Sequence, residues 1–188
     1  SSLRKSCRTV LNILFYRLVT WLAPVMVFTT EEVWLERFPG DMSSVHLQDF
    51  PDETKEWKDQ SLAVRWEAIR QVRKVVTGAI EVERQKKVIG SSLEAAPSIF
   101  IDNQDLYRVI NSIDFAEISI TSATSICEGN TSKKAFSLEE SPDISVVFNR
   151  AAGEKCSRCW KYGTDLVTVQ AGALVCHRCS DVISNQKK

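Results

Sequence analysis

Four cysteines near the end of the chain form two pairs with the spacing of a metal site. Two residues separate the cysteines within each pair, and sixteen residues separate the pairs; the four are Cys156, Cys159, Cys176 and Cys179. Zn²⁺ prefers thiolate sulfur, and two such pairs at this separation are a recognised tetrahedral pattern. The intervening segment has too few apolar residues to bury a core, so a metal would supply much of its folding free energy. The sequence predicts one zinc ion per chain on these four sulfurs.

Other uses of these cysteines stay open at this point. The same four cysteines could form two disulfides, remain as free thiols without a role, or act as the dithiols of a redox protein. His177 adjoins the second pair, but four thiolates already complete a tetrahedron, so we expect this imidazole not to bind the metal. Cys7 and Cys127 stand alone, and cysteines in metal spacing are typical of a reducing cytosol. We therefore expect a cytoplasmic protein.

Basic and aromatic side chains lie beside the cysteines. The net charge of the whole chain is zero, yet residues 151–188 carry 6 Lys and Arg against 3 Asp and Glu. Side chains in the middle of each CxxC turn are expected to point away from the metal, where they can meet phosphate. Trp160 either packs beneath the turn, which we favour, or stacks on a base. The candidate nucleic-acid contacts here are Arg158, Trp160, Lys161 and Arg178.

The first part of the chain must fold as helices. Apolar residues recur at steps of three and four from Val10 to Trp21, and Pro24 ends that pattern. A second helix is expected to begin at Thr29-Thr30, with hydroxyl caps, and to stop at Pro39-Gly40. Residues 43–52 read as an extended connection.

A long basic helix is predicted from about residue 53 to 88, with Gly90 in the position after its last turn. Two interpretations of its charges remain open: a solvated face laced with ion pairs, or a face that follows a nucleic-acid backbone. The second interpretation makes four of its residues candidate nucleic-acid contacts: Arg73, Lys74, Arg84 and Lys87.

The sequence changes period in the middle of the chain. Strands are expected at residues 98–102, 116–120 and 144–148, a helix capped by Asn103 at 104–113, and loop or weak hairpin at 121–142. Residues 166–169 and 173–175 would pair around 170–172 as the hairpin of a zinc ribbon. We predict a mainly α fold in three parts: a helical bundle (1–96), a small α+β unit (97–152) and a zinc ribbon (153–188).

Composition excludes several classes of protein. The chain has 188 residues, of which 44% are hydrophobic and 26% charged, as in ordinary globular proteins. Its longest apolar run, near residues 18–28, is too short and interrupted to span a bilayer. No secretory signal opens the sequence, and the first residue is not Met, so we expect a piece of a longer protein.

Two segments resemble one enzyme family. Residues 21–34, WLAPVMVFTTEEVW, are similar to the helical anticodon-binding region of class I aminoacyl-tRNA synthetases for branched aliphatic amino acids. Residues 73–95, which end in KKVIGSSLEA, and the two cysteine pairs are similar to the bacterial isoleucyl-tRNA synthetase family. The resemblance spans nearly the whole chain, although the middle part matches mainly by position.

The resemblance implies a role in holding the anticodon arm of an isoleucine tRNA. The family attaches isoleucine to tRNA with ATP, but the HIGH and KMSKS motifs of its catalytic domain do not occur here. We therefore expect this piece to be inactive alone, to need ATP only through an absent domain, and to act as a monomer with the rest of the synthetase chain. The alternatives are a DNA-repair glycosylase with a similar zinc ribbon, or a zinc-stapled protein-interaction module.

Overall fold

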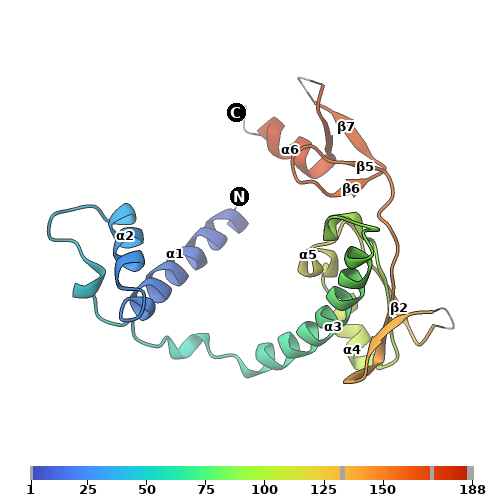
Figure 1. Ribbon diagram of the computed structural model, residues 1–188, viewed down its shortest axis with the longest axis horizontal. Coiled ribbons are helices and arrows are strands. Elements are labelled where there is room, and N and C mark those ends of the chain that lie inside the picture. Colours follow the sequence, from blue (N-terminus) through green and yellow to red (C-terminus); the bar gives the residue numbers. More distant parts are fainter. Residues whose placement is uncertain (1, 132–133, 170–171, 186–188) are drawn as a thin grey trace. The chain divides into compact units, whose positions relative to one another are not determined.

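The computed structural model divides the chain into two compact units, residues 1–58 and 59–188. It describes residues 2–131, 134–169 and 172–185. This division differs from the predicted ends at 96 and 152, because the long basic helix belongs to the second unit, where it packs on a sheet (Figure 1). Among the described residues, no helix is both long and apolar enough to cross a membrane.

The first unit is built around Trp34. Its helices are α1 (Ser2–Leu22), α2 (Val27–Arg37) and the short 3₁₀ turns η1 (Val45–Leu47) and η2 (Lys55–Trp57). The Trp34 ring is buried with Val19, Ala23 and Val45, and its Nε1 donates to Ser43 Oγ at 3.0 Å. A buried indole with a satisfied N–H joins both helices to the following loop.

Two details of this unit correct the sequence predictions. Helix α2 begins at Val27 rather than at the predicted Thr29–Thr30, and buried Thr30 donates to the Met26 carbonyl instead of capping a terminus. Residues 45–47 form a 3₁₀ turn rather than extended chain. The cause is Glu31, whose carboxylate accepts from Ser44 Oγ and from the Val45 N–H and so folds the loop back onto α2.

Helix α3 (Gln60–Gln85) opens the second unit. It starts later than the predicted residue 53 because Asp59 caps it, accepting from the Leu62 N–H at 2.9 Å. Its end also differs from the prediction. Lys87, with φ of +59°, takes the left-handed position expected of Gly90, while the Lys87 and Val88 N–H groups donate back to Arg84 and Glu83.

A four-stranded mixed sheet lies against α3. Its order is β2-β1-β4-β3, with β1 and β2 parallel and the other pairs antiparallel. The chain passes from β1 to β2 through two short helices. The elements are η3 (Ser92–Glu94), β1 (Ser98–Ile101), α4 (Gln104–Asn111), α5 (Phe115–Ser119), β2 (Ser125–Glu128), β3 (Phe136–Leu138) and β4 (Ser141–Val147).

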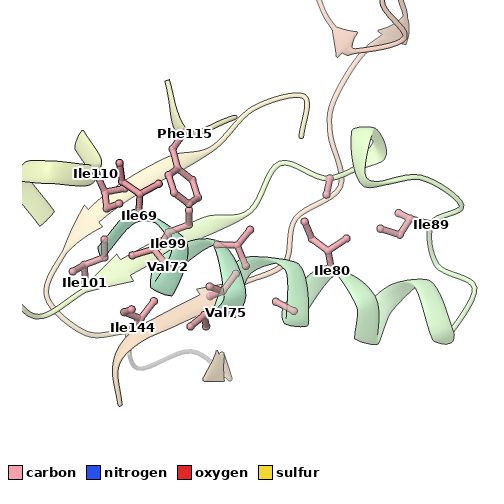
Figure 2. Packing of buried hydrophobic residues seen from close by; sticks show 14 residues of the cluster. Ile69, Val72, Val75, Ile80, Ile89, Ile99, Ile101, Ile110, Phe115 and Ile144 are labelled. Atoms are coloured by element: carbon pink, nitrogen blue, oxygen red, sulfur yellow. The ribbon is translucent and has the colours of Figure 1, made fainter. Parts of the chain in front are cut away.

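The main core lies between α3 and this sheet. Figure 2 shows Val72 and Val75 of α3 facing Ile99 of β1 and Ile144 of β4, all with side chains removed from water. Fourteen buried side chains form this cluster. Such a core is large enough to hold the unit together without other support.

The predicted strand at 116–120 is wrong, because these residues form α5. Asp114 caps the helix by accepting from the Glu117 N–H, and Phe115 anchors it in the core. The alternation that suggested a strand ends at Ile120, which is 54% exposed and left-handed with φ of +56°. Tertiary anchoring by one aromatic side chain therefore outweighs a short period-two pattern.

The last part of the chain is the cysteine module. Its hairpin of β7 (Leu166–Thr168) and β8 (Leu174–Cys176) confirms the predicted strands, although residues 170–171 of the predicted turn lie outside the described residues. A smaller pair, β5 (Glu154–Lys155) and β6 (Tyr162–Gly163), precedes it, and the helix α6 (His177–Asn185) follows. The predicted fold class, helical region followed by mixed sheet and cysteine unit, is confirmed.

Candidate metal centre and nucleic-acid interface

The four predicted cysteines converge on one point. Their Sγ atoms all lie within 4.8 Å of one another, and Cys159 and Cys176 are 3.7 Å apart. A tetrahedron with Zn–S bonds of about 2.3 Å has edges of roughly 3.8 Å, so the cluster has the size of such a site. His177 is not part of the group. Cys156 and Cys179 are buried and the other two are half-buried.

Backbone hydrogen bonds shape the two turns that carry the sulfurs. The Trp160 N–H donates to the Cys156 carbonyl, and the Cys156 N–H donates to the Lys161 carbonyl. Trp160 has φ of +67°, so the chain reverses there and returns as β6. The second pair spans the junction of β8 and α6, where the Cys176 N–H donates to Cys156 Sγ at 3.3 Å.

The electrostatics of the cluster favour a cation. Burial acts to raise the pKa of Cys156, but the N–H groups of Cys159, Cys176 and Arg158 outweigh it and lower this pKa to about 6. Burial raises the pKa of Cys179 to about 11, against the Arg158 side chain and with the help of the other sulfurs. Four negative sulfurs this close repel one another unless a metal ion sits between them. The donor set therefore fits a thiophilic divalent ion.

The two arginines of the CxxC turns do not point away from the sulfurs, contrary to our expectation. Arg158 Nη1 lies 3.7 Å from Cys179 Sγ. Arg178 Nη1 lies 2.8 Å from Glu117 Oε1 of α5, and the Cys159 sulfur is also among the groups acting on this guanidinium. The physical reason is the negative charge of the thiolates, which attracts the nearest cations. Both side chains nevertheless keep exposed surface.

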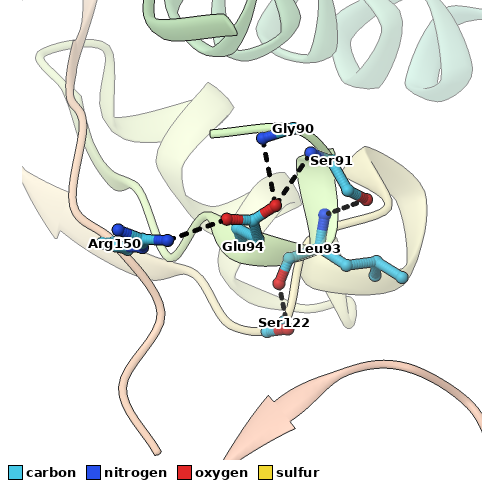
Figure 3. Close-up of polar contacts among 6 residues, drawn as sticks. All are labelled: Gly90, Ser91, Leu93, Glu94, Ser122 and Arg150. Carbon is cyan, nitrogen blue, oxygen red and sulfur yellow. Dashed lines mark hydrogen bonds and ion pairs between the residues drawn. The ribbon is translucent and has the colours of Figure 1, made fainter. Parts of the chain in front are cut away.

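The cysteine module is tied to the rest of the second unit by specific bonds. Ser122 Oγ accepts from the Tyr162 N–H at 2.7 Å and donates to the Leu93 carbonyl at 2.5 Å. Figure 3 shows the neighbouring anchor, in which the Glu94 carboxylate accepts from the Gly90 and Ser91 N–H groups and meets Arg150. These contacts, together with Arg178–Glu117, bring η3, α5 and the cysteine module together.

Trp160 is exposed, so the prediction that it packs beneath the turn is wrong. Its side chain is 58% exposed, and Lys155 Nζ lies 4.9 Å from the ring centroid. Both residues line a cavity of about 180 Å³ that also touches Leu93 and Tyr162. A left-handed backbone at Trp160 turns the indole outward. The arrangement offers a flat aromatic face with a cation beside it.

The basic residues predicted on the long helix have internal partners in three of four cases. Arg84 binds Glu81 through two nitrogens, at 2.7 and 3.0 Å, and Lys74 pairs with Glu140. Arg73 Nε donates to the Ile118 carbonyl. Lys87 instead ends the helix in a left-handed conformation. The solvated face laced with ion pairs, left open above, therefore describes most of α3.

Two family models match the chain. Residues 1–99 match the anticodon-binding domain of tRNA ligase, and residues 153–182 match a zinc finger found in FPG and IleRS. The chain belongs to the tRNA-ligase anticodon-binding domain family. The first match covers more than half of the sequence, and the second covers the four-cysteine cluster.

Similar proteins identify the branch of this family. The chain is 48% identical to the isoleucine–tRNA ligase of Ruegeria pomeroyi over 94% of its own length and 18% of the ligase. It is 49% identical to those of Bartonella henselae, over 88% of the chain and 17% of the ligase, and of Agrobacterium fabrum, over 87% and 17%. The chain thus corresponds to the anticodon-binding region of isoleucine–tRNA ligase and spans less than a fifth of these relatives.

Sequence reasoning missed several residues that build this region. Lys155 escaped notice because it precedes the first cysteine instead of lying between cysteines. Glu117 was assigned to a strand, and Ser122 to a featureless loop. A hydroxyl or carboxylate that joins two distant segments carries no local pattern, so only the fold reveals it.

Proposed function

We propose that this chain holds the anticodon arm of an isoleucine tRNA for a ligase that charges that tRNA. The carrying observation is the combination of an anticodon-binding match over residues 1–99 with a cysteine-built module that presents an exposed indole beside a lysine. Unpaired anticodon bases can be stacked on aromatic faces and held by cations. The joining of isoleucine to tRNA with ATP belongs to the whole ligase.

One zinc ion per chain is proposed for Cys156, Cys159, Cys176 and Cys179. The ion would be structural, since four thiolates leave no open position for a substrate. Its charge would balance the sulfurs and hold the two turns at a fixed distance, which in turn fixes Trp160. Metal analysis of the purified chain should return about one zinc, and a folded, metal-free chain would contradict the assignment.

The proposed RNA contacts differ in how available they are. Exposed Trp160 and half-buried Lys161 lie at the chain reversal after the first cysteine pair, and exposed Lys155 lies beside the Trp160 ring. Arg158 and Arg178 sit beside the sulfurs with exposed edges, so their proposed role is phosphate attraction from fixed positions. Arg73, Lys74 and Arg84 would have to exchange internal partners for phosphate, which leaves Lys87 as the most available cation of the four on the long helix.

A matched pair of tryptophans tests the stacking surface. Trp160 and Trp57 are each 58% exposed, and each has a cation near its ring, Lys155 at 4.9 Å and Arg17 at 5.5 Å. Trp160→Ala should weaken binding of the anticodon stem-loop by about 1–3 kcal/mol, whereas Trp57→Ala should leave it unchanged. Fluorescence anisotropy with matched and mismatched anticodon loops measures both. Equal effects of the two variants would contradict the assignment of the stacking surface to the cysteine module.

The rival of a DNA-repair glycosylase has no support beyond the shared type of zinc finger, since residues 1–99 match a tRNA-ligase domain. For the whole protein we propose a cytoplasmic location and a monomeric state, with the remainder of the ligase chain as the constant partner. A sedimentation experiment on the RNA-free ligase would test the monomer.

A further inference from the structure

A second basic site lies in the first unit, far in the sequence from the cysteines. A cavity of about 730 Å³ is lined by one residue of α2, Arg37, and by six residues of α1: Lys5, Arg8, Thr9, Leu11, Asn12 and Phe15. Among the described residues that line it there is no carboxylate. Lys5, Arg8, Asn12 and Phe15 recur at steps of three and four, so they form one stripe along α1.

The cations of α1 differ from those of α3. Helix α1 contains four basic residues and no acidic residue over its whole length. On α3, by contrast, Arg70 and Arg84 pair with carboxylates of the same helix, and Lys74 pairs with Glu140. These carboxylates partly neutralise the positive charge of α3. The stripe on α1 has no such acids on its own helix, so its positive potential extends into the groove.

The groove is partly ordered by its own residues. Arg37 Nη2 donates to Asn12 Oδ1 at 3.2 Å, and the guanidinium carbon lies 5.4 Å from the centroid of the Phe38 ring. A guanidinium has five N–H donors, so this bond leaves others for a ligand. Because Asn12 accepts through Oδ1, its Nδ2 hydrogens also remain as donors. Fixed donors lower the entropy cost of holding an anion.

We infer that this groove binds the phosphodiester backbone of RNA. Arginine, lysine and asparagine donors to phosphate oxygens are the usual sequence-independent contacts of nucleic-acid-binding proteins. Lys5 and Arg8 are separated by about 4.5 Å along the helix axis, and a nucleic-acid strand repeats its charge at similarly short intervals. The inference rests on the proposed function and adds to it a contact that positions the RNA without reading its bases.

An acidic protein segment is the competing occupant. RNA is favoured because the groove lies wholly within the segment that matches an anticodon-binding domain. Two acidic residues of α2, Glu32 and Glu36, line a separate cavity that shares Phe15 and Arg37 with the groove. They mark one border of the site, and an RNA strand would run on the side of Lys5 and Arg8.

A double variant tests the inference in the complete 188-residue chain. Lys5→Gln with Arg8→Gln removes two charges from the groove, and Lys55→Gln with Lys58→Gln removes two exposed charges from the same unit outside it. Binding of a fluorescent isoleucine anticodon stem-loop is measured over a series of KCl concentrations. The first variant should bind roughly tenfold more weakly and lose about two from the slope of log K against log salt. The control should keep the wild-type slope.

Two further readouts separate the possible failures. Bound RNA should protect Lys5 from an amine-reactive reagent and leave Lys55 reactive. If the wild-type chain does not bind the stem-loop, the proposed function fails and this inference with it. If the wild type binds while the groove variant keeps its slope and Lys5 stays reactive, only the inference fails. The same holds if the variant loses thermal stability within the whole ligase but retains RNA binding, since the groove would then seat protein.

Discussion

The two halves of the second unit are held together by different means. Around α3 and the sheet, fourteen buried side chains, some of them from α4 and α5, form one apolar cluster. Among the described residues of the cysteine module, the buried cluster consists of Cys156, Val175 and Cys179, and the sheets are two-stranded. Isolated two-stranded sheets are marginal in water, so the module needs its sulfurs and a metal where the larger half needs only packing.

The difference indicates how each half serves function. The side chains of the apolar core are buried against one another, so they are not available to bind a ligand. The module uses few residues for a core, so exposed Lys155 and Trp160 and half-buried Lys161 lie beside the metal-binding turns. A metal can thus replace a core and leave a short chain's side chains available for binding.

Removal of the metal should show the largest difference in stability between the two halves. Structural zinc contributes an apparent 10–16 kcal/mol in zinc-finger peptides, so a strong chelator, or Cys156→Ser, should unfold residues 154–185. Helix α3 and its sheet should persist because their core has no part in the metal site. Amide hydrogen exchange of the whole chain would show protection lost in the module alone. If amide protection in the module survives without metal, the module does not depend on the metal for its fold.

Core truncation should affect the other half. Ile144 is fully buried against α3, whereas Ile120 is 54% exposed. Ile144→Ala should lower the free energy of unfolding by about 2–5 kcal/mol, since it removes apolar contacts and leaves a cavity. Ile120→Ala should change it by less than about 0.5 kcal/mol. Urea unfolding of the zinc-loaded chain gives both values, and similar losses at the two sites would show that packing of Ile144 against α3 is not the source of stability.

The sequence predicted those features that depend on spacing. The cysteine cluster, the hairpin β7–β8 and the strand β1 follow from patterns within a few residues of one another. Asn103 was correctly predicted to cap α4, and it accepts from the Leu106 N–H at 3.0 Å. Local chemistry of this kind needs no knowledge of the rest of the chain.

The sequence did not predict features that depend on a distant partner. Residues 116–120 alternate like a strand, yet Phe115 inserts into the α3 core and makes them helical. Arg158 and Arg178 were expected to point away from the metal, but Arg158 contacts Cys179 Sγ and Arg178 pairs with Glu117. Trp160 turns outward because its backbone is left-handed, which no neighbouring residue signals. In each case a tertiary contact or backbone reversal outweighed the local rule.

Two glycines with the same backbone conformation test how tightly the module is attached. Gly153 and Gly129 both have φ of +84°. A Cβ at Gly153 would lie 2.1 Å from the Gly163 carbonyl oxygen, whereas a Cβ at Gly129 would have no atom of the described residues within 4 Å. Gly129→Ala should cost about 1 kcal/mol for its left-handed backbone. Gly153→Ala should cost roughly 2–3 kcal/mol because the β5–β6 pairing must also shift. Thermal unfolding of both variants measures the difference, and equal costs would mean that the two strands are not in close contact.

Glu94 gives the smallest expected effect, and it depends on pH. The Gly90 N–H lowers the pKa of this carboxyl most, burial opposes it, and Ser91 and Arg150 add to the lowering, so the pKa lies below its usual 4.5. A depressed pKa in the folded chain stabilises the fold above about pH 4.5, and this contribution is lost as the pH falls through the folded value. Glu94→Gln should therefore cost about 1 kcal/mol at neutral pH and less in acid.

Asp105→Asn is the control for this pH dependence, since Asp105 is 93% exposed in its pair with Arg108 and should change stability little at any pH. Urea unfolding at a series of pH values compares the two variants with wild type. A loss at Glu94 that stays constant from neutral to acid would assign its effect to shape instead of charge. In that case η3 would be held by packing, like the α3 core, and the polar anchor beside the module would be incidental to its attachment.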